Sequence, residues 1–201
     1  MISIVLPTYL GAYKYAASGR EWKLARAIQS CINQYFQDWQ LIVVCDGCER
    51  SMEIVKENPD SRIKALLIEK QPLFSGTPRN TGIEYSDGDW ICYLDNDDFL
   101  AKDHLSLVSE QMNGFDWLFF NDWILRGENF QERTCFLKKG KCGTSNIAHK
   151  KSMKARWERN ARYGTDDWMF INSLMSESSN WKKIDAEYLV CHVPYGKGFE
   201  I

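Results

Sequence analysis

The fold class of this chain follows most directly from residues 89–98, which read Asp89-Trp90-Ile91-Cys92-Tyr93-Leu94-Asp95-Asn96-Asp97-Asp98. An apolar run at residues 90–94 ends there in three carboxylates within four positions. Continuous apolar runs of this length are typical of parallel strands that are buried on both faces. In open α/β sheets, ligands bind beyond the carboxyl ends of such strands. The stretch therefore predicts a buried strand with a binding site at its end.

Strand-like and helix-like segments alternate on both sides of this stretch. Apolar runs predict further strands at residues 2–6, 41–45, 62–68 and 115–120, and the first of these is expected to end at Pro7. Apolar residues at helical spacing predict helices over residues 21–35 and 103–112. Thr77 and Pro78 are expected as the N-cap and the first position of another helix. This alternation favours an α/β sandwich with a mostly parallel sheet, followed by a less regular C-terminal region.

Length and composition restrict the class of protein further. The 201 residues, of which 44% are hydrophobic and 26% charged, suit a single globular domain over residues 1–201 and exclude a disordered chain. Apolar runs stay far below the ~20 residues of a membrane helix, so we expect no integral membrane segment. Seven scattered cysteines indicate reduced core thiols, and the N-terminus lacks the basic lead of a signal peptide. We therefore expect a cytoplasmic protein.

Charge is distributed unevenly along the chain, although the net charge is only −2. Residues 84–103 are rich in acids and contain one base, Lys102, whereas residues 138–162 are rich in Lys and Arg and contain one acid, Glu158. The simplest interpretation of each segment is a solvated face. Alternatively, the basic segment covers a bound diphosphate, contacts a partner or faces an anionic membrane to which the protein is peripheral. The near-neutral total argues against a nucleic-acid-binding protein.

The three carboxylates after the strand at residues 90–94 indicate a metal site. Carboxylates so close together repel one another, and a divalent cation removes that conflict. Oxygen ligands suit Mg²⁺ or Mn²⁺, which are usually shared with substrate phosphates. Asp95 and Asp97 would point the same way if the backbone stays extended. The alternative is an acidic surface turn in which Asp98 or Asp103 caps the next helix.

Other readings of the same carboxylates can be tested by spacing. An EF-hand loop that starts at Asp95 would need Gly and Glu where the chain has Leu100 and Ser106, so it is excluded. A phosphotransferase with Asp95 as nucleophile also places carboxylates two apart after a hydrophobic strand, and it stays open. The chain has neither GxGxxG nor GxxxxGK[ST], which argues against a standard dinucleotide fold or a P-loop.

Read from end to end, the chain resembles glycosyltransferase family 2. Residues 2–9 are similar to the family's opening strand and Pro-Thr-Tyr turn, with Leu10 in place of the usual Asn. The resemblance continues through the first helix, the second strand with its terminal Asp, the Arg-Asn-x-Gly segment, the DxD region and a later pair of acids, at residues 26–39, 41–47, 78–82, 89–98 and 163–168. Cys45 and Cys48 depart from the Asp and Ser of the family pattern.

The resemblance implies a GT-A fold and inverting transfer of a sugar from a nucleoside diphosphate sugar to an acceptor hydroxyl, assisted by Mn²⁺ or Mg²⁺. Residues 1–98 would form the nucleotide-sugar-binding part and residues 99–201 the acceptor-side part. Asp46 would read uracil, which favours a UDP-sugar, although a dTDP-sugar presents the same base edge. The donor-binding residues implied are Pro7, Thr8, Tyr9, Asp46, Arg79, Asp95 and Asn96, and the metal ligands are Asp97, Asp95 and His192.

Two of these assignments also have physical support. Arg79 is expected in the first turn of a helix, where backbone N–H groups and a guanidinium both favour phosphate, and its alternative role is a surface ion pair. His192 follows an apolar run, where a neutral imidazole could join the metal or hydrogen-bond the diphosphate. A structural role for His192 is the alternative.

A base must also take the proton from the acceptor hydroxyl. Asp167 matches the family's base, and Asp166 occupies the neighbouring acidic position. Since the two are adjacent and chemically identical, they could exchange roles, and both could instead be acids at a helix N-terminus.

The acceptor stays unidentified, whether glycan, lipid-linked or protein-linked. Alternative functions are a Mg²⁺-dependent phosphotransferase, a nucleotidyltransferase, or a non-catalytic binding module that uses the basic residues 138–162 on nucleic acid or acidic lipid.

Overall fold

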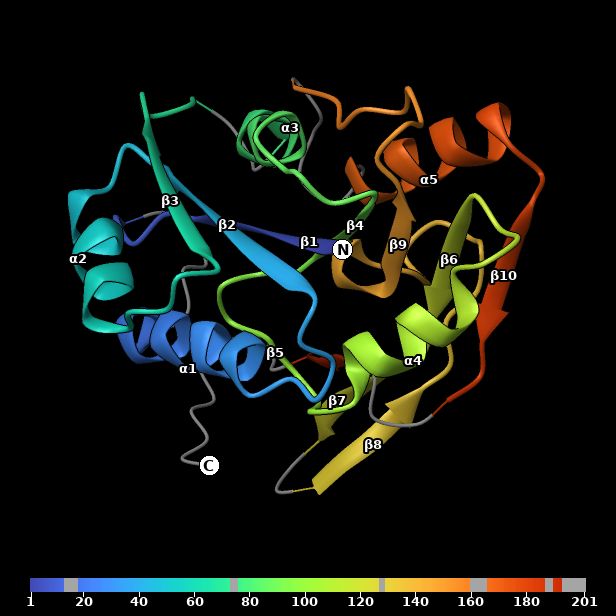
Figure 1. Ribbon diagram of the computed structural model, residues 1–201, viewed down its shortest axis with the longest axis horizontal. Coiled ribbons are helices and arrows are strands. Elements are labelled where there is room, and N and C mark those ends of the chain that lie inside the picture. The colour runs from blue at the N-terminus through green and yellow to red at the C-terminus, as the bar shows by residue number, and fades with distance from the viewer. Residues whose placement is uncertain (13–17, 73–75, 127–128, 160–165, 187–189, 193–201) are drawn as a thin grey trace.

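The computed structural model describes residues 1–12, 18–72, 76–126, 129–159, 166–186 and 190–192, with only the backbone for Arg126 and for residues 190–192. Figure 1 shows these residues as helices and strands arranged in layers around a twisted sheet.

Among the described residues, the central sheet has seven strands in the order β10-β6-β9-β4-β1-β2-β3. All neighbours run parallel except β9, which is antiparallel to both β4 and β6. The predicted mostly parallel sheet is therefore confirmed. The bounds are β1 Ile2–Thr8, β2 Trp39–Asp46, β3 Ile63–Ile68, β4 Trp90–Tyr93, β6 Trp117–Phe120, β9 Ile147–Lys150 and β10 Trp181–Ile184.

Helices cover both faces of this sheet, as the sequence predicted. Three lie on one face in Figure 1, namely α1 (Arg20–Ile32), α2 (Glu49–Glu57) and α4 (His104–Gln111). On the other face lie α3 (Gly76–Glu84) and α5 (Asp166–Glu177). Each layer seals its own hydrophobic core, one including Leu24 and Leu105 and the other Ile83 and Phe170. No helix in the described part of the chain is both long enough and apolar enough to cross a bilayer.

A smaller sheet, not predicted from the sequence, lies beside the first and has the order β5-β11-β7-β8. Its strands are β5 (Phe99–Leu100), β7 (Asp122–Arg126), β8 (Asn129–Arg133) and β11 (Val190–His192). The sequence signal fails here because the strands are short, β8 is largely exposed, and β11 pairs with segments far away in the chain. A 3₁₀ turn, η1 (Thr144–Asn146), leads into β9.

Two predicted element boundaries at prolines are wrong by two residues, and the first helix, predicted over residues 21–35, ends at Ile32. Helix α3 begins at Gly76, so Thr77 is not its N-cap and Pro78 lies inside its first turn. That position tolerates proline because the first four N–H groups of a helix lack an intrahelical partner. Strand β1 continues past Pro7 to Thr8, since β4 pairs only as far as Val5 and beyond that point β1 pairs with β2 alone. Proline is accepted in strands where one side is not paired.

The parallel strands bring their carboxyl ends to one edge of the sheet. Thr8 ends β1, Asp46 ends β2, and Asp95 follows β4 by two residues. Segments that are remote in sequence therefore place polar side chains side by side at this edge.

Candidate functional site

Asp46 lies at the end of β2 with both carboxylate oxygens in hydrogen bonds. Its Oδ2 accepts from Lys70 Nζ at 2.7 Å, and its Oδ1 accepts from the backbone N–H of Gln71 at 2.7 Å. The Lys70 ammonium also lies 4.2 Å from the centre of the Tyr9 ring. Each carboxylate oxygen has two lone pairs, so Asp46 keeps acceptor capacity for a further donor. These contacts fix a carboxylate beside an aromatic ring at the sheet edge.

Thr8 links the end of β1 to the acidic segment that follows β4. Asn96 Nδ2 donates to Thr8 Oγ1 at 2.9 Å, and Ser51 Oγ lies 3.4 Å from the same hydroxyl. Two of the residues that the sequence assigned to donor binding are thus in direct contact. Pro7, also assigned there, is buried within β1.

The acidic segment is a turn and not an extended strand. The N–H of Asp98 donates to the carbonyl of Asp95 at 3.1 Å, and Arg26 Nη2 donates to the carbonyl of Asp97 at 2.7 Å. The expectation that Asp95 and Asp97 point the same way was conditional on an extended backbone, and this condition is not met. Asp95 and Asp98 are the two acids of this turn that line a common cavity.

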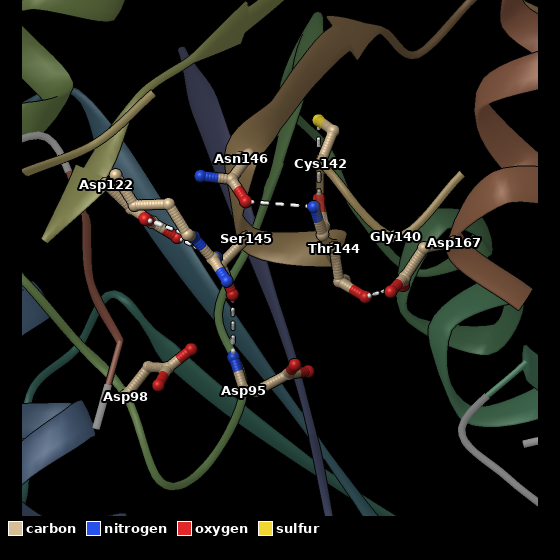
Figure 2. A pocket seen from close by; sticks show the side chains of 11 residues that line it. Asp95, Asp98, Asp122, Gly140, Cys142, Thr144, Ser145, Asn146 and Asp167 are labelled. Carbon is tan, nitrogen blue, oxygen red and sulfur yellow. Dashed lines mark hydrogen bonds and ion pairs between the residues drawn. The ribbon is translucent and has the colours of Figure 1, made fainter. Parts of the chain in front are cut away.

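That cavity has a volume of about 240 Å³ and a strongly acidic lining. Its carboxylates come from Asp95 and Asp98 in the turn, Asp122 of β7 and Asp167 of α5. Figure 2 shows these side chains around the cavity, with η1 forming the wall between them. The cavity therefore joins the edge of the main sheet, the small sheet and the start of α5.

Asp122 is neutralised inside the cavity by Arg133 across the β7–β8 pair. Arg133 Nε donates to Asp122 Oδ1 at 2.8 Å, and Nη2 contacts the other carboxylate oxygen. Burial of Asp122 makes such a two-point ion pair necessary, because an unpaired buried carboxylate is costly. This pair was not predicted, because its only signal in the sequence is an Asp and an Arg on two short strands.

Arg79, in the first turn of α3, joins the acidic turn to the start of α5. Its Nη2 lies 2.8 Å from Asp95 Oδ1 and its Nη1 lies 3.5 Å from Asp166 Oδ2. The side chain is only 4% exposed, and its guanidinium lies 4.5 Å from the centre of the Trp157 ring. The guanidinium is therefore already engaged with two carboxylates and an aromatic face.

Asp167 has an environment unlike that of its neighbour Asp166. The hydroxyl of Thr144 donates to Asp167 Oδ1 at 2.5 Å (Figure 2). Burial raises the pKa of Asp167 to about 6, the Arg79 charge opposes this, and the Asp166 charge adds to it. A carboxyl group with a pKa near neutrality, held beside a cavity, suits a general base. Residues 163–165, which precede this pair in the predicted motif, lie outside the described residues.

Lys70 and Thr144, which hydrogen-bond to two of the predicted acids, were not among the residues predicted from the sequence. Lys70 follows β3 by two residues, so the rule that strand ends share an edge could have found it. Thr144 had no such signal, because only tertiary packing brings η1 beside α5.

For the predicted metal site, the described residues provide carboxylates at the acidic turn but no complete set of protein ligands. The described residues contain no group of three or more His, Cys, Asp or Glu side chains placed to hold an ion. The backbone of His192 pairs with β7 opposite Ile124, and its side chain lies outside the described atoms. Asp97 lies in the acidic turn, between Asn96 and Asp98.

Comparisons with known proteins find relatives among glycosyltransferases. The profile of glycosyl transferase family 2 matches residues 3–116, more than half of the chain. An uncharacterized glycosyltransferase of Haemophilus influenzae is 36% identical over 110 residues, 52% of this chain and 39% of that protein. A Campylobacter jejuni protein named GalNAc(5)-diNAcBac-PP-undecaprenol beta-1,3-glucosyltransferase is 28% identical over 160 residues, 78% of this chain and 48% of that protein. The chain spans less than half the length of either relative.

A solved structure supports the fold. TarS 1-349 of S. aureus, crystallised in complex with UDP-GlcNAc, matches with a TM-score of 0.75 at 14% identity, covering 98% of this chain and 59% of that one. At this identity the likeness shows the fold alone. Together with the family match, it confirms the predicted GT-A architecture.

Proposed function

Because the chain belongs to glycosyltransferase family 2, we propose that it transfers a sugar from a nucleoside diphosphate sugar to an acceptor hydroxyl with inversion of configuration. The observation that carries this proposal is the acidic cavity at the carboxyl edge of the sheet, where Asp167 combines a raised pKa with a hydrogen bond from Thr144. In this reading, residues 1–98 bind the donor and residues 99–201 receive the acceptor. The family match also favours glycosyl transfer over a phosphotransferase or nucleotidyltransferase.

The donor is a UDP-sugar in this proposal. Asp46 keeps acceptor capacity for the uracil N–H, and Lys70 holds its carboxylate in place. Tyr9 and Thr8 line the base side, with Asn96 bridging from Thr8 toward the diphosphate. The UDP-GlcNAc complex of the structurally similar TarS supports this choice of donor.

Proton transfer falls to Asp167. Its carboxylate lies at the cavity, and the Thr144 hydroxyl orients one oxygen and leaves the other for the acceptor proton. A positioned general base contributes about 10²–10⁴-fold to such a step. Asp166 is held by Arg79 instead, so its role is to set the charge around the base.

Mn²⁺ or Mg²⁺ fits the acidic turn by ligand type, because Asp95, Asp97 and Asp98 offer only hard oxygen ligands. With few protein ligands converging there, the donor diphosphate would supply the remaining oxygens, as is usual for Mg²⁺. When bound, such a cation would neutralise charge on the leaving diphosphate. In this proposal Asp97 and Asp95 would hold the ion, and His192 is a further candidate ligand.

We expect UDP to bind in the presence of Mn²⁺ and to bind at least about 10-fold more weakly after EDTA treatment or in Asp97→Ala, since a charged contact contributes about 1.5–3 kcal/mol. Titration calorimetry with and without EDTA measures this. Asp103→Ala, a nearby acid beyond the turn, is the control and should bind normally. Equal UDP affinity with and without metal would contradict the proposed metal role.

Asp46→Ala should weaken UDP binding by about 10- to 100-fold, the value of a hydrogen bond to a charged group. The affinity for ADP should change little, because adenine lacks the imide N–H that this carboxylate is proposed to bind. Fluorescence or calorimetric titration with both nucleotides separates the two effects. Asp60→Ala, which breaks an Asp–Arg pair at the start of β3, is the matched control. An equal loss for both nucleotides would show that Asp46 supports the fold and does not read the base.

A further inference from the structure

The turn at residues 136–141 is held firmly at both ends. The flanking Cys135 and Cys142 are buried in the core that lies under α5. The N–H of Phe136 donates to the carbonyl of Lys141 at 3.1 Å, and Gly140 adopts a left-handed φ of 71° that closes the turn. We call residues 136–141 the basic turn. Its backbone is fixed by these contacts, so its outward side chains are presented in a defined place.

The outward side chains of the basic turn combine positive charge with an aromatic ring. Lys138, Lys139 and Lys141 are exposed, and Phe136 is 56% exposed. The ammonium of Lys183 lies 5.6 Å from the centre of the Phe136 ring and is itself paired with Asp185 at 2.6 Å. Phe136 and the three lysines therefore form one exposed surface that combines an apolar ring with positive charge.

The basic turn borders the acidic cavity. Gly140 and Cys142 line that cavity together with Asp167, and Figure 2 places all three along one side of it. Whatever surface the turn contacts will therefore lie next to the opening through which an acceptor reaches the proposed base.

We propose that the basic turn docks the protein on an anionic lipid bilayer, with Phe136 inserted at the headgroup level and the three lysines facing lipid phosphates. Segments that combine basic residues with an aromatic or aliphatic residue bind membrane interfaces in two ways: the charges attract anionic headgroups, and the apolar side chain is buried at the interface. The positive charge that would attract anionic lipid is a local property of the basic turn, since the chain as a whole is slightly acidic. A single-stranded nucleic acid would need a row of stacking aromatic side chains, whereas the turn offers one.

This inference goes beyond the proposed function, because bilayer binding requires neither nucleotide nor metal. It has one consequence for that function: an acceptor carried by a lipid would meet the cavity at the membrane surface. The Campylobacter jejuni relative, whose name includes a diphosphate-linked undecaprenol, is consistent with this arrangement.

Co-sedimentation with vesicles tests the proposal. The protein should bind vesicles that contain phosphatidylglycerol and phosphatidylcholine, and bind pure phosphatidylcholine vesicles much less. Replacing Lys138, Lys139 and Lys141 with Gln should weaken binding to the anionic vesicles by about 100-fold, at about 1 kcal/mol per lysine. Phe136→Ala should weaken it several-fold without changing its salt dependence. The matched controls are Lys56, Lys64 and Lys102, also exposed, replaced with Gln, and the exposed Tyr35→Ala.

Three outcomes would overturn the proposal. In the first, the control triple variant loses as much affinity for anionic vesicles as the basic-turn variant does, which would indicate a general effect of charge. Another is displacement from vesicles by inorganic pyrophosphate at equal charge concentration, which would indicate a site for soluble phosphate. The third is tighter binding to single-stranded RNA than to anionic vesicles. Thermal unfolding of every variant should match that of the unaltered chain, because all of the replaced side chains are exposed or half-exposed.

Discussion

Asp167→Asn should lower the kcat of sugar transfer by at least about 100-fold and leave the affinity for UDP unchanged. The amide keeps the size of the side chain and can still accept from Thr144, but it cannot take a proton from the acceptor. Turnover of the nucleotide sugar and calorimetric titration with UDP measure the two quantities. If Asp167→Asn turns over at the rate of the unaltered enzyme, Asp167 is not the base.

Asp166→Asn is the paired control for this experiment. Asp166 contacts Arg79 at 3.5 Å and does not line the cavity, so its loss should reduce turnover far less than the loss of Asp167. The opposite order of effects would move the base to Asp166. The two variants have the same charge, so the comparison isolates position.

The raised pKa of Asp167 also has a consequence for stability. The folded-state pKa of about 6 lies above the ordinary value of 3.8, so the folded protein favours the protonated form. Stability should therefore fall as pH rises from about 4 through about 6, and Asp167→Asn should escape this loss, gaining about 1–3 kcal/mol at neutral pH. Chemical denaturation at acidic and neutral pH would show the difference in stability. The acid limb of the pH–rate profile, that is, the fall in the rate of sugar transfer at low pH, should follow the same pKa.

Arg79 is expected to give the largest effect on stability. Arg79→Met would leave the carboxylates of Asp95 and Asp166 without their buried countercharge, and removing one partner of a buried pair costs about 3–5 kcal/mol. Denaturant midpoints measure this. Arg50→Met, at an exposed arginine that contacts three glutamates, is the control and should leave the midpoint nearly unchanged.

Arg79→Lys keeps the charge and separates two roles for this residue. A single ammonium cannot contact Asp95 and Asp166 together as the guanidinium does, so its hold on the acidic cluster weakens. If Arg79 positions the acids, the acid limb of the rate profile should move to higher pH while the UDP affinity stays the same. If Arg79 binds the diphosphate, as the sequence alone suggested, the UDP affinity should fall and the acid limb should stay in place.

Parts of the fold were predictable because a strand that is buried on both faces can be recognised from its own residues. Strands β1 and β2 are buried along their whole length, and each reads as a mostly apolar run. Such runs predict parallel pairing, and parallel pairing predicts that Thr8, Asp46 and Asp95 meet at one edge. The small sheet gave no comparable signal, since its strands are short and partly exposed and β11 pairs far from its place in the sequence.

The candidate site divides in the same way. Sequence alone determined which acids follow strands and that they gather at the carboxyl edge, because the end of a strand is a local property of the chain. Tertiary structure alone decided that Asp95 and Asp98 share a cavity, and that Asp167 and not Asp166 faces it. Two adjacent, identical side chains carry no sequence difference. Their burial and their distances to Arg79 and Thr144 come from the packing of remote segments, and these set the charge and proton affinity of each acid.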